Sequence, residues 1–192
     1  MDLTQILALL LMAIFYAAYF TKMLLQRKKG IQTNQIGKGK KDKRTDRIEL
    51  LMKIATYAII PVELGSIFGK FRLWNTPWSY GGIGLSALGI FLFIIAMGTM
   101  RDSWRAGIPA TDKTELVTGG IYRISRNPAF FGFDLLYFGI LLAFFNVVHL
   151  LFALFAVTML HLQILQEERF LEGLFGEDYL RYKAKTGRYF IL

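Results

Sequence analysis

Five apolar runs, each close to the length that crosses a bilayer, constrain this chain most. A helix that crosses a hydrocarbon core of about 30 Å needs roughly 20 apolar residues. With 54% hydrophobic and only 19% charged residues, the chain is too apolar for an ordinary soluble domain. We therefore predict an all-α polytopic membrane protein with about five transmembrane helices, at Leu3–Leu25, Ile48–Phe68, Gly81–Met100, Ala129–Phe145 and Val147–Leu165.

Several of these runs carry further expectations. The first is too long for a signal-peptide core and has an acidic start, so we expect a retained spanning helix. The last two are separated only by Asn146, which predicts a tight helical hairpin; one long bent helix is the alternative. The glycines of Gly81–Gly84 open a span rather than following a strand, which favours close helix packing over a nucleotide-binding loop.

Lys and Arg are concentrated in the segments 26–47, 101–126 and 166–192, which hold 19 of the 23 basic residues. With five crossings these segments fall on one face of the membrane. The positive-inside rule then places the amino terminus outside and the carboxyl terminus in the cytoplasm. The net charge of +9 is divided between apolar segments, so we expect anionic membrane lipids as partners and no nucleic acid. Because the chain has no cysteine, disulfides, cysteine metal sites and thiolate nucleophiles are excluded.

A polar cluster, "TGGIYRISRNPAFFGF", spans Thr118–Phe133 at the start of the fourth apolar run. Proline is favoured in the first turn of a helix, and Asn127 directly before Pro128 is well placed as an N-cap. The free N–H groups of that helix end, together with Arg126, suit a carboxylate or a phosphate. A capped helix start whose arginines reach lipid headgroups is an equally weighted alternative.

A second cluster, "HLQILQEERFLEGLFGEDYLRY", ends the fifth run. Helical spacing places Gln163 and Glu167 on one face and His161 and Glu168 on another. Carboxylates near the carboxyl end of a helix need a cationic partner, so we expect a bound cation or an arginine there. A hairpin would bring the two clusters together into a pocket for a zwitterionic ligand. No metal-ligand spacing is visible, and we expect no metal.

The ordered combination "LVTGGIYRISRNPAFFG" and "EERFLEGLFGEDYLRYKAKTGR" resembles the isoprenylcysteine carboxyl methyltransferase family and the related membrane phospholipid methyltransferases. The resemblance covers about residues 101–190. For residues 1–100, which match only in being membrane spans, the apolar runs and the basic residues predict three transmembrane helices with a basic cytoplasmic loop at 26–47. Residues 101–192 would form the methyltransferase core, with two transmembrane helices and a cytoplasmic tail.

The resemblance also implies a cytoplasm-facing S-adenosylmethionine site. Carried over by position, the cofactor-binding residues are Glu115, Leu116, Val117, Tyr122, Asn127, Pro128, Ala129, Phe130 and Glu167. Methyl transfer from a sulfonium depends on alignment in a dry site more than on a covalent nucleophile. Arg126 or Arg188 would orient a carboxylate acceptor, whereas Glu168 would accept the proton of an amine.

The acceptor stays open between the carboxylate of an isoprenylcysteine and the amine of a phospholipid. Gln163 stands where the prenylcysteine enzymes carry an arginine implicated in acceptor binding, and it completes the candidate catalytic set with Arg126 and Glu168. A non-catalytic membrane protein, in which both clusters only anchor helix ends, is the alternative from another functional class.

Overall fold

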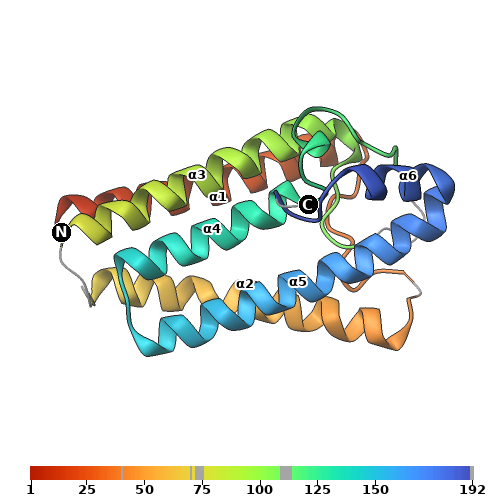
Figure 1. Ribbon diagram of the computed structural model, residues 1–192. Coiled ribbons are helices and arrows are strands. Elements are labelled where there is room, and N and C mark those ends of the chain that lie inside the picture. The colour runs from red at the N-terminus through yellow and green to blue at the C-terminus, as the bar shows by residue number, and fades with distance from the viewer. Residues whose placement is uncertain (40, 70, 72–75, 109–113, 191–192) are drawn as a thin grey trace.

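The computed structural model describes residues 1–192 except 40, 70, 72–75, 109–113 and 191–192. The described chain is helical, without a strand of its own, and its long helices run side by side (Figure 1). The elements are α1 (Leu3–Lys28), α2 (Lys43–Phe68), α3 (Thr76–Met100), η1 (Arg101–Ser103), η2 (Gly120–Arg123), α4 (Pro128–Ala143), α5 (Val147–Phe175) and α6 (Glu177–Lys185).

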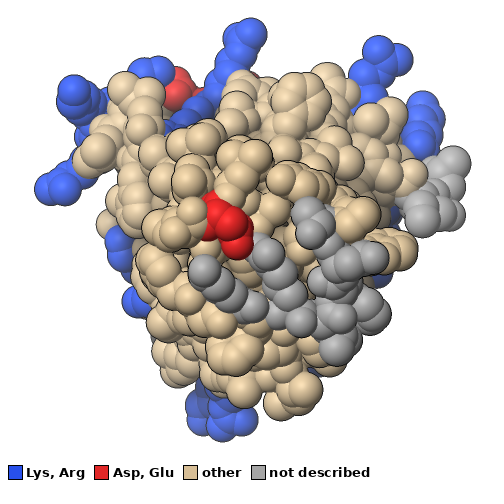
Figure 2. Space-filling model, turned by 90° about the vertical axis from the view of Figure 1, so that its left-hand side faces the viewer, with Lys and Arg blue, Asp and Glu red and all other residues tan. Residues whose placement is uncertain are grey.

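Successive long helices run in opposite directions, so the described parts of the three basic segments gather at one end of the bundle (Figure 1). We call this the basic end. The opposite end shows mostly uncharged residues, with one acidic patch near its middle and Lys and Arg only around the rim (Figure 2). This segregation of charge agrees with the division of basic segments expected from the sequence.

Four helices are long and apolar enough to cross a membrane: α1, α2, α3 and α5. The fourth predicted run is shorter than expected, because α4 ends at Ala143 and has 16 residues. At 1.5 Å per residue α4 spans about 24 Å, less than a bilayer core. Phe144 and Phe145 continue without helical geometry to Asn146, which begins the next helix.

The predicted hairpin between the last two runs is present. The Asn146 side chain caps α5 by accepting a hydrogen bond from the His149 amide at 2.9 Å. Its own amide donates to the Ser66 hydroxyl at 2.7 Å, which fixes the turn against α2. α4 packs most extensively on α3, and α5 on α2, so the hairpin joins two helix pairs.

The close packing of α3 on α4 depends on glycine. A Cβ atom on Gly89 would lie 2.6 Å from the carbonyl oxygen of Gly132, and one on Gly132 would lie equally close to Gly89. Gly82 faces Gly139 in the same way, whereas Gly84 faces open space. The expected small-residue packing is therefore confirmed for Gly82. A second contact of the same kind joins Gly89 and Gly132.

Candidate active site

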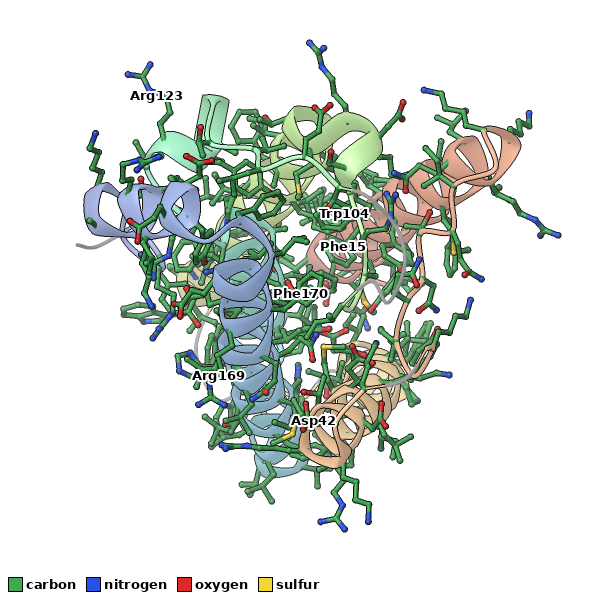
Figure 3. The ribbon with its side chains drawn as sticks, turned by 90° about the vertical axis from the view of Figure 1, so that its right-hand side faces the viewer. Phe15, Asp42, Trp104, Arg123, Arg169 and Phe170 are labelled. Carbon is green, nitrogen blue, oxygen red and sulfur yellow. The ribbon has the colours of Figure 1, made fainter. Side chains whose placement is uncertain are left out.

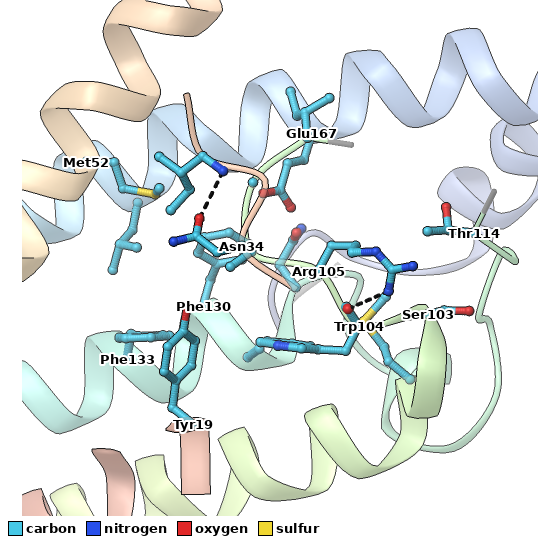
Figure 4. A pocket seen from close by; sticks show the side chains of 18 of the residues that line it. Tyr19, Asn34, Met52, Ser103, Trp104, Arg105, Thr114, Phe130, Phe133 and Glu167 are labelled. Carbon is cyan, nitrogen blue, oxygen red and sulfur yellow. Dashed lines mark hydrogen bonds between the residues drawn. The ribbon is translucent and has the colours of Figure 1, made fainter. Parts of the chain in front are cut away.

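A cavity of about 420 Å³ opens near the basic end and continues into the bundle (Figure 4). Its lining comes from α1, α2, α4, α5 and α6, from single residues of α3 and η2, and from residues of the segments 34–36, 103–108 and 114–117. Nine of the twelve residues predicted for the site line it: Glu115, Leu116, Val117, Tyr122, Arg126, Asn127, Ala129, Phe130 and Glu167. Pro128, Gln163 and Glu168 lie outside this lining.

The start of α4 lacks the side-chain cap that was expected from Asn127. Asn127 occupies the N-cap position, but its side chain makes no capping hydrogen bond. Its amide instead donates to Glu168 Oε1 at 3.3 Å and to the Arg188 carbonyl at 3.1 Å. The first-turn N–H groups of Ala129 and Phe130 consequently have no side-chain cap and belong to residues of the cavity wall. Such donors suit an anionic group.

Glu168 is held by two arginines. Arg126 Nη2 lies 2.9 Å from Glu168 Oε1, and Arg188 Nη2 lies 2.9 Å from Oε2. The side chains of Glu168 and Arg126 are 5% and 8% exposed, so this pair is buried. Arg126 Nε also donates to Glu168 Oε1, at 3.2 Å. The third guanidinium nitrogen, Nη1, donates to the carbonyls of Lys183 and Thr186. These contacts use all three guanidinium nitrogens and fasten the chain after α6 to the start of α4.

Glu167 faces the cavity from the neighbouring position on α5 (Figure 4). The Gln163 amide donates to Glu167 Oε1 at 3.0 Å, which confirms their shared helical face. Gln163 is fully buried, and its Oε1 has no hydrogen-bond partner among the described residues. The geometry thus favours Gln163 as a residue that positions Glu167.

The expectation that α5 ends near Leu165 is wrong, because the helix continues to Phe175. Glu167 and Glu168 therefore lie within the helix, more than a turn from its end. At that distance the helix dipole no longer requires a cationic partner for them. The extra turns are stabilised by apolar side chains. Phe170 points into the interior, as do Phe15 and Trp104, whereas Arg169 and Arg123 point outward (Figure 3).

Tyr122 and Tyr182 connect α6 to η2. The Tyr182 hydroxyl donates to the Tyr122 carbonyl at 2.6 Å, and both rings contribute to the cavity wall. Burial raises the pKa of both phenols well above the ordinary value of tyrosine. Nearby Tyr182 raises the pKa of Tyr122 a little further. Arg126 partly opposes the rise in the pKa of Tyr182. The two hydroxyls are therefore neutral donors at physiological pH.

The sequence model of a family described as phospholipid methyltransferase matches residues 78–178, just over half of the chain. The chain belongs to the phospholipid methyltransferase family. No curated protein matches the chain significantly. The predicted family resemblance is confirmed, and it makes this protein a membrane methyltransferase that acts on lipid.

The matched region of this phospholipid methyltransferase family member holds α4, α5 and the polar clusters, but the cavity also uses residues before it. Asn34, which precedes the matched region, and Trp104 and Arg105, which lie within it, line the cavity and were not predicted from the sequence (Figure 4). Trp104 Nε1 has no hydrogen-bond partner within the described chain, so it is a donor available to a ligand. No local sequence signal marked Asn34 or Trp104.

Glu49 was also missed. It is fully buried on α2 and accepts hydrogen bonds from the Gly37 amide at 2.7 Å and the Ile108 amide at 3.1 Å. Lys41 Nζ lies 2.7 Å from its carboxylate. Glu49 thereby holds two loops of the basic end near the cavity. A carboxylate inside the apolar run Ile48–Leu51 was the available signal.

Proposed function

We propose that this protein transfers the methyl group of S-adenosylmethionine to a lipid or lipid-like acceptor inside the cavity at the basic end. The observation that carries the proposal is the convergence of nine predicted site residues on one cavity, eight of them from residues 115–130 and the ninth, Glu167, from α5. The cofactor supplies an electrophilic methyl group when it is bound. The chain needs only to bind, align and keep water away.

The residues present fit such a cofactor. The uncapped first turn of α4 offers backbone donors to its carboxylate, and the flat ring of Tyr122 offers a packing surface. Segment 115–117 borders the same space, where the Glu115 amide donates to the Ser103 hydroxyl at 3.3 Å. Glu167 places a carboxylate oxygen in the cavity for a positively charged group.

Access for a lipid is supported by the far part of the cavity, which is largely apolar and aromatic. Phe20 of α1 and Tyr57 of α2 line it while remaining 48% and 59% exposed, so they border an opening on the side of the bundle. An acceptor in the bilayer would enter between these two helices. The apolar lining would hold its hydrocarbon part and exclude water from the reacting end.

The charges near the cavity favour an amine over a carboxylate as the acceptor group. Arg126 was expected to bind a carboxylate acceptor, but its guanidinium nitrogens donate to Glu168 and to backbone carbonyls. Glu168, the expected base for an amine, is occupied by Arg126 and Arg188. Glu167 faces the cavity, so we assign it the binding of the amine and the acceptance of its proton.

We further propose that the basic end faces the cytoplasm, with the amino terminus outside. The proposal rests on the gathering of the basic segments at the end of the bundle that carries the cavity. A cytoplasmic site would have direct access to a soluble cofactor.

Titration of S-adenosylhomocysteine into the detergent-purified protein, followed by calorimetry, tests the cofactor assignment. We expect saturable binding that Glu167→Gln weakens roughly tenfold, as for the loss of one charge-assisted hydrogen bond. Glu172→Gln, which removes a carboxylate of the same helix that pairs with Lys183, is the matched control and should bind normally. Absence of binding to folded wild-type protein at millimolar ligand would rule out the proposal.

Incubation with methyl-labelled S-adenosylmethionine, a total lipid extract and prenylcysteine analogues tests the acceptor. Label in an amine-bearing lipid is the expected result. Label in the prenylcysteine analogues alone would instead assign carboxyl methylation and contradict the role given to Glu167.

A further inference from the structure

A polar group that the proposed chemistry does not use lies just beyond the residues that line the inner end of the cavity. Glu63 of α2 is fully buried, and neither of its carboxylate oxygens has a hydrogen-bond partner among the described residues. An unpaired carboxyl group within a membrane-spanning helix is costly and rarely retained without a use.

Helical spacing aligns Glu63 with the cavity. Met52, Thr56 and Ile60 of α2 line the cavity at intervals of four residues, and Glu63 follows three residues later on the same face. From Met52 to Glu63 the helix rises about 16 Å. Glu63 therefore lies beyond the innermost lining residue of α2, far from Glu167 and the basic end.

Two phenols mark the same place. The Tyr16 hydroxyl of α1 is buried without a hydrogen-bond partner in the described chain, and its side chain lines the cavity. Tyr137 of α4 is fully buried, also lines the cavity, and lies within electrostatic range of Tyr16, Glu63 and Asp134. Two phenols thus line the closed end of an otherwise apolar space, and the Glu63 carboxyl group lies within electrostatic range of both.

We propose that this closed end is a binding subsite, formed by Glu63 and Tyr16, for a hydroxyl or amine at the far end of the methyl acceptor. The inference deepens the proposed function by naming the acceptor class: an elongated apolar molecule that carries a polar group at each end. One end reaches Glu167 at the basic end. The other donates a hydrogen bond to Glu63 and satisfies its buried oxygens.

An experiment with simple amphiphiles tests the subsite without any cofactor. A twelve-carbon α,ω-diol and the matching one-ended alcohol are titrated by calorimetry into the full-length protein in nanodiscs. We expect the diol to bind roughly tenfold more tightly than the alcohol, as for one added hydrogen bond to a buried acceptor. Glu63→Leu should abolish this preference, whereas Asp46→Leu, which removes an exposed carboxylate from the same helix, should retain it.

A second variant covers the case in which Glu63→Leu does not fold. Tyr16→Phe keeps the ring and removes only the hydroxyl, and it should reduce the preference for the diol severalfold. Equal binding of both amphiphiles to the wild type, or an unchanged preference in a folded Glu63→Leu or Tyr16→Phe variant, would overturn the proposal. Sodium binding that is lost in Glu63→Leu, with no amphiphile preference, would overturn it in favour of an ion site.

The result separates this inference from the proposed function. A protein that prefers the diol but does not bind S-adenosylhomocysteine would retain the subsite and lose the methyltransferase assignment. A protein that binds S-adenosylhomocysteine but does not distinguish the amphiphiles would retain the methyltransferase assignment and lose the subsite.

Discussion

Glu168 and Arg126 form a buried ion pair, with 2.9 Å between Oε1 and Nη2, although 42 positions separate them in the chain. The pair joins α5 to the residue just before the N-cap of α4. Arg188 extends it to the segment that follows α6. One carboxylate therefore sets the relative positions of the two predicted polar clusters.

Removal of the Glu168 charge should destabilise the protein. Glu168→Gln leaves Arg126 buried without its carboxylate, which typically costs about 3–5 kcal/mol. A lower midpoint of thermal unfolding in detergent is the expected measurement. Arg169→Gln alters an exposed neighbour on the same helix and should shift the midpoint little. Similar midpoints for the two variants would show that the ion pair does not hold the clusters together.

Loss of the Gln163 amide should act on the ligand through Glu167. Gln163→Leu removes the 3.0 Å hydrogen bond to Glu167 and replaces the amide with an apolar side chain of similar size. We expect the dissociation constant for S-adenosylhomocysteine to rise severalfold with little loss of thermal stability, because Glu167 is no longer held toward the cavity. Gln166→Leu changes another buried glutamine of α5, outside the cavity lining, and should leave binding unchanged. An equal rise in both variants would remove the positioning role.

Tyr182→Phe should lower the free energy of unfolding by about 0.5–1.5 kcal/mol, the usual net contribution of one hydrogen bond. The Tyr122 carbonyl loses its donor in this variant. Burial raises the pKa of the Tyr182 phenol above its ordinary value near 10. The folded and unfolded states are therefore both protonated below that value, and the phenol adds no pH dependence there. As the pH rises past it, the unfolded state ionises first and wild-type stability should fall. Unfolding midpoints measured against pH for both proteins test this, since a steeper fall in the variant would contradict it.

A single methyl group should distinguish the glycines of α3. Gly89→Ala places a Cβ atom 2.6 Å from the Gly132 carbonyl oxygen, so α3 and α4 must separate, at a cost of about 1–3 kcal/mol. Gly84→Ala meets no atom within 4 Å and should be neutral or slightly stabilising, because alanine favours helix. Thermal unfolding of the two variants gives the comparison, and equal midpoints would mean that the glycine contact carries no energetic weight.

Much of the fold was predictable because spanning length and apolar composition are strong local signals. The helical bundle, the Asn146 turn and the Gln163–Glu167 pair all follow from spacing along the chain. The ordered motif also placed nine site residues on one cavity, since a hairpin brings its two ends together.

The errors and omissions involve long-range contacts. Asn127 has the residue type of an N-cap, but Glu168 and the Arg188 carbonyl compete for its amide. The end of α5 was placed too early because residues 166–175 look polar, although Phe170 and Phe175 face the cavity. Glu49 serves two loops that are distant in sequence, and spacing alone does not reveal such a partner.

The short length of α4 has a consequence for how a lipid would meet the enzyme. A helix of about 24 Å within a core of about 30 Å leaves roughly 6 Å of hydrocarbon thickness uncovered. If the carboxyl end of α4 reaches one boundary of the hydrocarbon, its first turn lies that far below the boundary at the basic end. A lipid would then move its reactive group a short way inward to be methylated, and it would never have to leave the bilayer.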